Sequence, residues 1–195
     1  MEPVLTRLTP DDYVTTTWAG GTTTQLAIAP KGALYANRDF LWRVSSATVE
    51  ADESDFTVLN DYERVISTVR GEMTLRHNGG EELTLRPGDI HAFDGADNTH
   101  SAGRCTDFNL MLRKGRAEGN MCVLHADKTC DASLCCESGA VTLLYCVSGE
   151  YTVRCSKQET ALAAGEAALV EQNGGGEAVR LSAADDSLVY AAQAW

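Results

Sequence analysis

Positive charge, histidine and long apolar runs are all scarce in this sequence. Only 16 Lys and Arg residues stand against 28 Asp and Glu, which gives a formal net charge of −12 at pH 7. Because an acidic surface repels phosphate backbones and anionic lipid, we expect no nucleic acid and no membrane among the partners. No run is apolar enough to span a bilayer, and the first residues lack the basic and apolar regions of a secretion signal. We therefore expect a cytoplasmic protein.

The cysteine spacing that is typical of structural zinc sites is also absent. The chain has 7 Cys, and an odd number without a secretion signal indicates reduced thiols. Several of them gather with His125 between Cys122 and Cys136, but no two form a Cys-x-x-Cys pair. We expect no zinc there, and we expect Cys146 and Cys155 to be small core residues.

What the chain does contain is a repeated pattern of short strands. In residues 65–93, apolar Met73 and Leu75 alternate with polar residues, as in a strand with one buried face. An Asn-Gly pair and then Pro-Gly-Asp mark the turns that follow. Residues 71–76 (GEMTLR) return as 149–154 (GEYTVR), and Gly88-Asp89 returns as Gly165-Glu166 at nearly the same offset. This agreement indicates an internal duplication.

The duplication predicts an all-β chain of two small antiparallel β-barrels packed as one unit. We place the N-terminal barrel at residues 1–116 and the C-terminal barrel at 117–195. Within the first barrel, residues 56–59 are apolar and are expected to form a strand, and residues 94–103 are polar and are expected to form a loop.

The pattern resembles that of a cupin, and two copies make a bicupin, with barrels of the double-stranded β-helix or jelly-roll type. Four segments sharpen the resemblance: residues 18–26 (WAGGTTTQL), 42–45 (WRVS), 62–64 (YER) and 107–111 (DFNLM). In this order they resemble the HutD/Ves family of bicupins, which is associated with histidine utilisation. The chain departs from the family at Ala19, where an Asn usually precedes the two glycines.

The resemblance implies a small-molecule-binding protein without an assigned reaction. Its first barrel would bind a small carboxylate such as N-formylglutamate, a product of histidine breakdown, and so sense or limit flux through that pathway. We therefore expect a non-catalytic sensor or regulator whose partner is a small anionic metabolite. A homodimer is a further expectation, although no interface can be identified in the sequence.

The first barrel offers side chains that suit a carboxylate. Arg43 and Arg64 would pair with it, because a guanidinium binds a carboxylate through two parallel hydrogen bonds. Trp18 would form an apolar wall, and Gly20-Gly21 would let the backbone approach a ligand closely. The remaining hydrogen bonds would come from Thr22, Thr23, Ser45 and Asn109. A surface salt bridge for Arg43, and plain β-propensity for the threonines, are the alternative interpretations.

The 4 His of the chain do not fall where a cupin metal site needs them. Most enzymatic cupins hold a metal ion with a His-x-His pair, then a Glu, and later another His. Counted from Gly71, the Glu position holds Arg64; counted from Gly88, the late His position falls at Thr99, one residue before His100. Since an open catalytic metal site generally needs about three protein ligands, we expect no metal and no other cofactor.

The competing hypothesis is a metal-free cupin enzyme, an isomerase or hydrolase that acts on a small organic acid or sugar. Such an enzyme needs a general base within reach of the pocket, and the candidates are Glu63, His91 and His100. No nucleophile with a histidine partner is evident, so a binding protein is the preferred interpretation.

Overall fold

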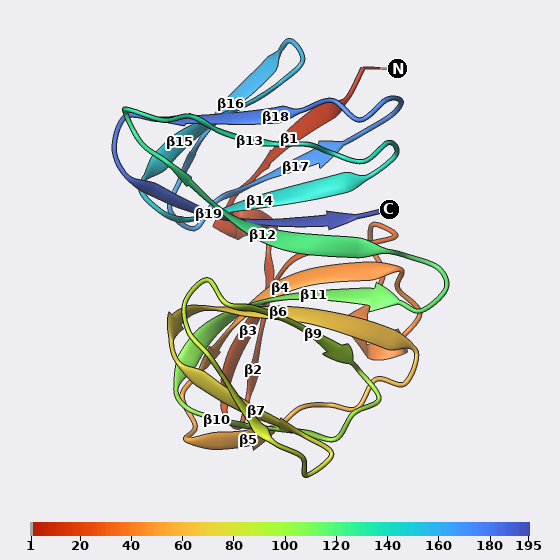
Figure 1. Cartoon of the computed structure of the whole chain (residues 1–195). Helices are drawn as coiled ribbons and strands as arrows, with labels where there is room; N and C mark the ends of the chain where they lie inside the picture. Colours follow the sequence, from red (N-terminus) through yellow and green to blue (C-terminus); the bar gives the residue numbers. More distant parts are fainter. Residues whose placement is uncertain (1) are drawn as a thin grey trace. The chain divides into compact units, whose positions relative to one another are not determined.

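The computed structural model describes residues 2–195, which are built almost entirely from antiparallel strands (Figure 1). Their contacts divide the chain into two compact units. One is Val14–Glu118, here the N-terminal unit, and the other joins the segment that ends at Tyr13 to Gly119–Trp195, here the C-terminal unit. No helix among these described residues is long and apolar enough to cross a membrane.

The N-terminal unit consists of two sheets. The larger has six strands in the order β2 (Val14–Trp18), β3 (Gly21–Ala29), β4 (Trp42–Val49), β11 (Cys105–Arg113), β6 (Tyr62–Gly71) and β9 (Ile90–Asp94). The smaller has four, in the order β5 (Glu53–Asp55), β10 (Thr99–Ala102), β7 (Met73–His77) and β8 (Glu82–Leu85). A single turn of 3-10 helix, η2 (Tyr35–Asn37), lies between β3 and β4.

The C-terminal unit repeats this plan with five and four strands. Its larger sheet has the order β1 (Val4–Leu8), β17 (Ala167–Glu171), β14 (Val141–Ser148), β19 (Ser187–Ala194) and β12 (Gly119–Ala126). Its smaller sheet has the order β13 (Ala132–Leu134), β18 (Val179–Ala183), β15 (Glu150–Cys155) and β16 (Gln158–Ala163). A short 3-10 turn, η1 (Pro10–Asp12), follows β1.

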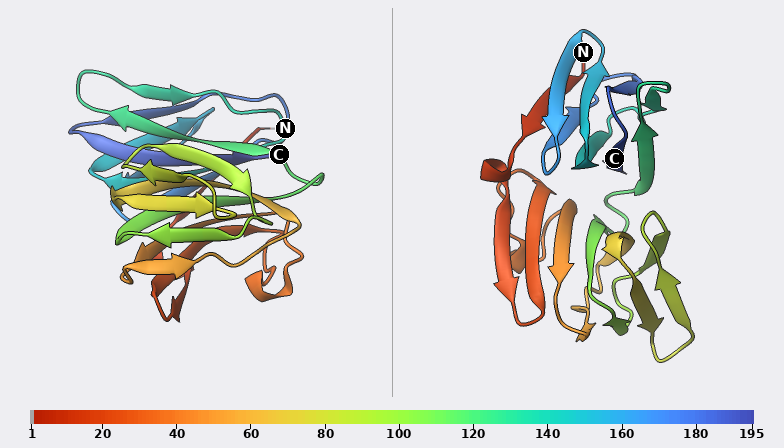
Figure 2. Two further views of the ribbon diagram at one scale, coloured as in Figure 1. Left: turned by 60° about the horizontal axis from the view of Figure 1, so that its bottom comes forward. Right: turned by 90° about the vertical axis from the view of Figure 1, so that its left-hand side faces the viewer.

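The first strand departs from the expected division at residue 116. β1 pairs with β17 in register from Val4↔Glu171 to Leu8↔Ala167, so it forms the edge of a sheet in the C-terminal unit (Figure 2). The side chain of Arg7 adds an ion pair to Glu166 at 2.5 Å. The sequence of β1 does not show which strand it pairs with, because the pairing joins residues more than 150 positions apart.

The duplication is visible in the glycines that precede corresponding strands. Gly71, before β7, has φ 78°, and Gly149, before β15, has φ 79°. A Cβ at Gly71 would lie 2.5 Å from the Arg104 carbonyl oxygen, and one at Gly149 would lie 2.7 Å from that of Asp186. Both glycines are therefore required by a positive φ and by the same close approach of a neighbouring chain.

The two units differ in what fills them. In the N-terminal unit, Ile66 of β6 packs with Met73 and Leu75, but Arg64 lies two residues earlier on the same face of the strand. The C-terminal unit is filled by apolar and cysteine side chains that include Leu144, Cys146, Val153, Cys155 and Leu181. The prediction that Cys146 and Cys155 are core residues is thus confirmed, and burial raises the pKa of the Cys146 thiol to about 11.

Candidate functional site

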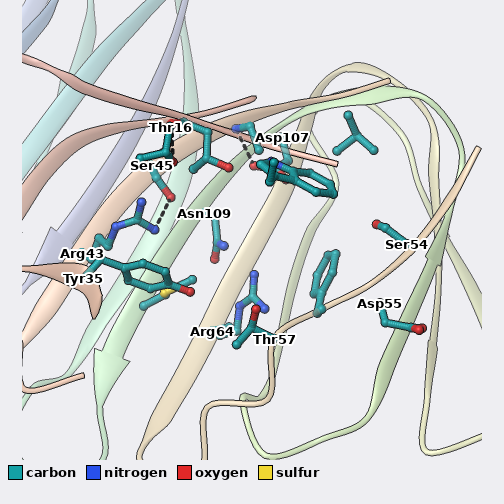
Figure 3. A pocket seen from close by; sticks show the side chains of 16 residues that line it. Thr16, Tyr35, Arg43, Ser45, Ser54, Asp55, Thr57, Arg64, Asp107 and Asn109 are labelled. Atoms are coloured by element: carbon teal, nitrogen blue, oxygen red, sulfur yellow. Dashed lines mark hydrogen bonds between the residues drawn. The ribbon is translucent and has the colours of Figure 1, made fainter. Parts of the chain in front are cut away.

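A cavity of about 270 Å³ lies inside the N-terminal unit (Figure 3). Strands β2, β3, β4, β6 and β11 contribute to its wall, together with η2 and the residues around the end of β5. The residues that line it are Thr16, Trp18, Thr23, Tyr35, Arg43, Ser45, Ala47, Val49, Ser54, Asp55, Phe56, Thr57, Arg64, Asp107, Asn109 and Met111.

The register of the larger sheet places the polar side chains of this cavity in rows. β11 pairs with β4 on one side and with β6 on the other, and Met111 lies opposite both Arg43 and Arg64. Two residues earlier, Asn109 lies opposite Ser45. Residues that face each other across antiparallel strands point to the same side, so alternate residues of β11 deliver their side chains into one space.

Arg64 is a buried cation without a hydrogen-bond partner in the described chain. Its side chain is 6% exposed, and its Nε is a buried donor with no acceptor. Its guanidinium carbon lies 4.5 Å from the ring centre of Phe56 and 5.2 Å from that of Phe93. Burial lowers the pKa of Arg64 to about 10, although Asp107 opposes this shift. The group is therefore still charged at neutral pH, and its hydrogen-bonding capacity is directed at the cavity.

Arg43, in contrast, is held in place by neighbours. Its Nε donates to Gln25 Oε1 at 2.8 Å and its Nη1 donates to Ser45 Oγ at 3.1 Å. The ring centre of Tyr35 lies 4.3 Å from its guanidinium carbon. Burial lowers the pKa of Arg43 as well. These contacts fix the orientation of the guanidinium and leave Nη2 without a hydrogen bond to the described residues.

Asp107 and Asn109 bring hydrogen-bond acceptors into the same cavity. Asp107 Oδ1 accepts a hydrogen bond from the backbone N–H of Ala47 at 3.0 Å. Burial raises the pKa of Asp107 to about 6, while the Ala47 N–H and the two arginines act in the opposite direction. The Asn109 side chain is 5% exposed, and its Oδ1 has no donor among the described residues.

Most of the residues predicted from the sequence meet in this cavity. Six of the seven line it: Trp18, Thr23, Arg43, Ser45, Arg64 and Asn109. The exception is Thr22, which does not line it, because adjacent residues of β3 point to opposite faces of the sheet. The alternative of a surface salt bridge for Arg43 is wrong, since that residue is 5% exposed.

The two glycines after Trp18 serve the backbone rather than the cavity. Gly21 has φ 150°, and a Cβ there would lie 2.0 Å from the Thr48 carbonyl oxygen on the neighbouring strand. A Cβ at Gly20 would meet the Trp18 ring. The groups that lie close to Gly20 and Gly21 are thus the Trp18 ring and β4, where a ligand was expected. Trp18 is 39% exposed and lies at the edge of the cavity.

The three predicted general bases lie outside the cavity. Glu63 is exposed and is next to Arg64, on the other face of β6. His91 Nε2 lies 2.9 Å from His77 Nε2, and both burial and His77 lower the pKa of His91. His100 Nδ1 lies 2.9 Å from Asp55 Oδ1 in an exposed pair. In residues 2–195, no three His, Cys, Asp or Glu side chains are grouped as a metal site requires.

Several lining residues were missed in the sequence. Asp107 precedes Asn109 by two residues on one strand, so strand periodicity alone could have placed it on the same face. Tyr35, Phe56 and Thr57 come from segments outside regular strands, and no local pattern identifies them.

Comparison with known proteins places the chain among those called HutD and Ves. The family model described as HutD matches residues 10–191. Protein Ves of Cronobacter sakazakii (strain ATCC BAA-894) is 35% identical over 98 residues, which is 48% of this chain and 52% of that protein. The alignment with this curated relative therefore spans about half of its length.

Solved structures cover nearly the whole chain. A conserved protein of unknown function from Pseudomonas aeruginosa PAO1 is 26% identical with a TM-score of 0.86, and 98% of each chain is covered. HutD from Pseudomonas fluorescens SBW25, in a formate condition, is 22% identical with a TM-score of 0.77, covering 97% of this chain and 98% of that one. A cupin 2 conserved barrel domain protein from Leptotrichia buccalis has a TM-score of 0.57 at 12% identity, covering 96% of this chain and 95% of that one. The predicted all-β fold of cupin type is confirmed.

Proposed function

The chain belongs to the HutD family, and from the cavity in its N-terminal unit we propose that it is a non-catalytic sensor or regulator that binds a small carboxylate such as N-formylglutamate. The observation that carries the proposal is the Arg64 guanidinium, which is buried and has no hydrogen-bond acceptor among the described residues. A buried charge without a partner is costly, so a protein that retains one has a use for it.

A carboxylate satisfies Arg64 in a way that a single carbonyl or hydroxyl oxygen does not. Its two oxygens match the parallel N–H donors of a guanidinium, and the resulting hydrogen bonds are charge-assisted. Arg43 presents a second guanidinium that is already oriented by Gln25 and Ser45. A site that is fixed before binding loses little conformational entropy when the ligand enters.

The remaining wall suits a small metabolite. Trp18, Phe56 and Met111 provide apolar surface, and the volume of about 270 Å³ limits the ligand to a compact molecule. Apolar walls with a few convergent polar groups are characteristic of small-molecule sites. The association of the family name with histidine utilisation makes N-formylglutamate the first ligand to test.

Isothermal titration calorimetry with N-formyl-L-glutamate tests the proposal. We expect binding to the wild-type protein and a loss of at least about tenfold in affinity for Arg64→Gln, because one charge-assisted contact is removed. Arg70→Gln is the matched control, since Arg70 is on the same strand but is exposed. Equal affinities of the wild type and Arg64→Gln, or no binding by either, would refute the proposal.

A metal-free enzyme is the second candidate, and Asp107 is the observation that favours it. A buried carboxyl group with a pKa near 6 that lines the cavity meets the usual requirement for a general base at neutral pH. Incubation of the protein with N-formyl-L-glutamate, followed by NMR, distinguishes the two functions. Steady conversion that is abolished in Asp107→Asn would replace a sensor with an enzyme, whereas unchanged ligand supports the binding role.

A further inference from the structure

The cavity contains unpartnered acceptors as well as unpartnered donors. Among residues 2–195, Arg64 Nε is a buried donor without an acceptor, and Asn109 Oδ1 is a buried acceptor without a donor. The Asp107 carboxylate accepts one hydrogen bond from that part of the chain, from the Ala47 N–H. A carboxylate has room for about four such bonds, so most of the accepting capacity of Asp107 is unused.

The acceptors lie on β11, and Arg64 lies on the neighbouring strand β6. Asp107, Asn109 and Met111 alternate on the cavity side of the strand, and Met111 is paired with Arg64. Figure 3 shows the Asn109 side chain between Arg64 and Asp107. A ligand whose carboxylate meets Arg64 and whose other end extends past Asn109 therefore approaches Asp107.

The ionised Asp107 carboxylate discriminates between two kinds of acid. It accepts hydrogen bonds and donates none, so it repels the oxygens of a second carboxylate and binds an N–H group. Burial raises the pKa of Asp107 to about 6, which leaves the group mostly ionised at pH 7.5. The buried charges of the cavity are Arg43, Arg64 and Asp107, which sum to one positive charge. Plain acids offer only acceptors to this arrangement.

Resting on the proposed carboxylate site, we propose that Asp107 makes the cavity selective for carboxylates that also carry an N–H donor. The ligand class is that of amino acids and N-acylamino acids, in which a carboxylate and an N–H are separated by a short carbon chain. Arg64 binds the carboxylate, Asp107 accepts the N–H, and Asn109 bonds to polar atoms between them. Asp107 is thus a specificity-determining residue.

Three probes, titrated by calorimetry at pH 7.5, separate this inference from the proposed function. N-formyl-L-glutamate has the N–H, N-formyl-N-methyl-L-glutamate lacks it at the same charge, and glutarate lacks the whole amide. L-Glutamate is a further arm, which distinguishes an ammonium N–H from an amide N–H. Each is titrated into the wild type and into Asp107→Asn, which retains an oxygen for the Ala47 N–H but presents an amide in place of the charged acceptor.

We expect N-formyl-L-glutamate to bind the wild type about 10- to 100-fold more tightly than its N-methyl counterpart, as a hydrogen bond to a charged group predicts. In Asp107→Asn this ratio falls toward one, while glutarate binds at least as tightly as before. The glutarate titration also shows that the variant is folded. A ratio that persists in Asp107→Asn would mean that the methyl group merely clashes, and would overturn the inference.

Equal binding of all probes by the wild type would overturn the selectivity while leaving the carboxylate site standing. Binding of none would refute both. A measurement that needs no variant uses N-formyl-L-glutamate labelled with ¹⁵N at its amide. Acceptance of the N–H by a carboxylate moves the amide proton resonance downfield in the complex, and an unshifted resonance contradicts the inference.

Discussion

Replacing Arg64 with Met is expected to make the ligand-free protein more stable while it abolishes binding. The Met side chain follows that of Arg as far as Nε and carries no charge, so the substitution removes the buried cation and retains the packing of the aliphatic stem. The fall in the pKa of Arg64 from 12.5 to about 10 corresponds to roughly 3 kcal/mol of unfavourable free energy for the charged form in the folded state.

Two contacts that are lost offset part of this gain. The guanidinium lies over the rings of Phe56 and Phe93, and cation–π contacts contribute about 0.5–2 kcal/mol when they are desolvated. The attraction of Asp107 opposes the fall in the pKa and is therefore already included in the figure of roughly 3 kcal/mol. We therefore expect Arg64→Met to raise the free energy of unfolding by about 1–2 kcal/mol, within the range found when buried charges are replaced by apolar residues.

Urea unfolding followed by tryptophan fluorescence measures this change, with Arg70→Met as the exposed control, for which we expect a change within about 0.5 kcal/mol. Calorimetry on the same samples tests for loss of N-formyl-L-glutamate binding. A destabilisation of Arg64→Met by more than about 1 kcal/mol would refute the reasoning, because it would mean that the guanidinium is well satisfied without a ligand. Binding sites commonly sacrifice stability for function in this manner.

Three further predictions concern the cavity, the turns and the thiols. Formate, which lacks an N–H, should bind severalfold more tightly at pH 5.5 than at pH 7.5, because protonation of Asp107, with its pKa near 6, removes a negative charge beside Arg64 and Arg43. Calorimetry at the two pH values measures this change in affinity, and a pH dependence that survives in Asp107→Asn would contradict the prediction. Gly71→Ala and Gly149→Ala should each lower the free energy of unfolding, measured by urea denaturation, by more than about 2 kcal/mol, because each glycine has a positive φ and a close carbonyl oxygen. Gly88→Ala, at φ 93° with open space around its Cβ position, should lower it by only about 1 kcal/mol. Equal losses in the three variants would exclude the close contact as the cause. A thiol reagent should label the exposed Cys130 and Cys135 first in the folded protein, and rapid labelling of Cys146 or Cys155 would show that the C-terminal unit opens readily.

The strands that sequence alone could predict are those with one apolar face. Met73 and Leu75 alternate with polar residues and form β7 as expected. Arg43 and Ser45 lie on one face of β4, as the two-residue periodicity of a strand predicts. The duplication added the second unit, because matching glycines imply matching turns.

β10 shows why other strands were missed. The polar residues 94–103 were expected to form a loop, yet they contain β10, whose buried side chains are hydroxyls. Thr99 Oγ1 lies 2.8 Å from His77 Nδ1, and Ser101 Oγ lies 2.9 Å from Ser54 Oγ. Because the buried side chains of β10 are polar and hydrogen-bonded, its sequence lacks the alternation of apolar and polar residues from which a strand is predicted.

The opposite error occurred at residues 56–59, which were expected to form a strand and form none. Phe56 lines the cavity and packs on Phe93 with ring centres 6.1 Å apart, so its apolar character serves the site. The residues of the candidate site that could be predicted from the sequence come from β2, β3, β4, β6 and β11. The parts that come from irregular segments, such as Tyr35, depend on long-range packing that no local pattern records.

The glycine framework shared by the two units has a consequence for how this protein tolerates mutation. Gly71 and Gly149 have nearly the same φ, although one precedes a barrel with a polar cavity and the other a barrel filled with apolar side chains. The turns therefore tolerate little change, while the residues that fill the two units differ. A library that varies the interior residues and preserves these glycines should yield mostly folded variants, so that new binding specificities can be selected without redesigning the fold.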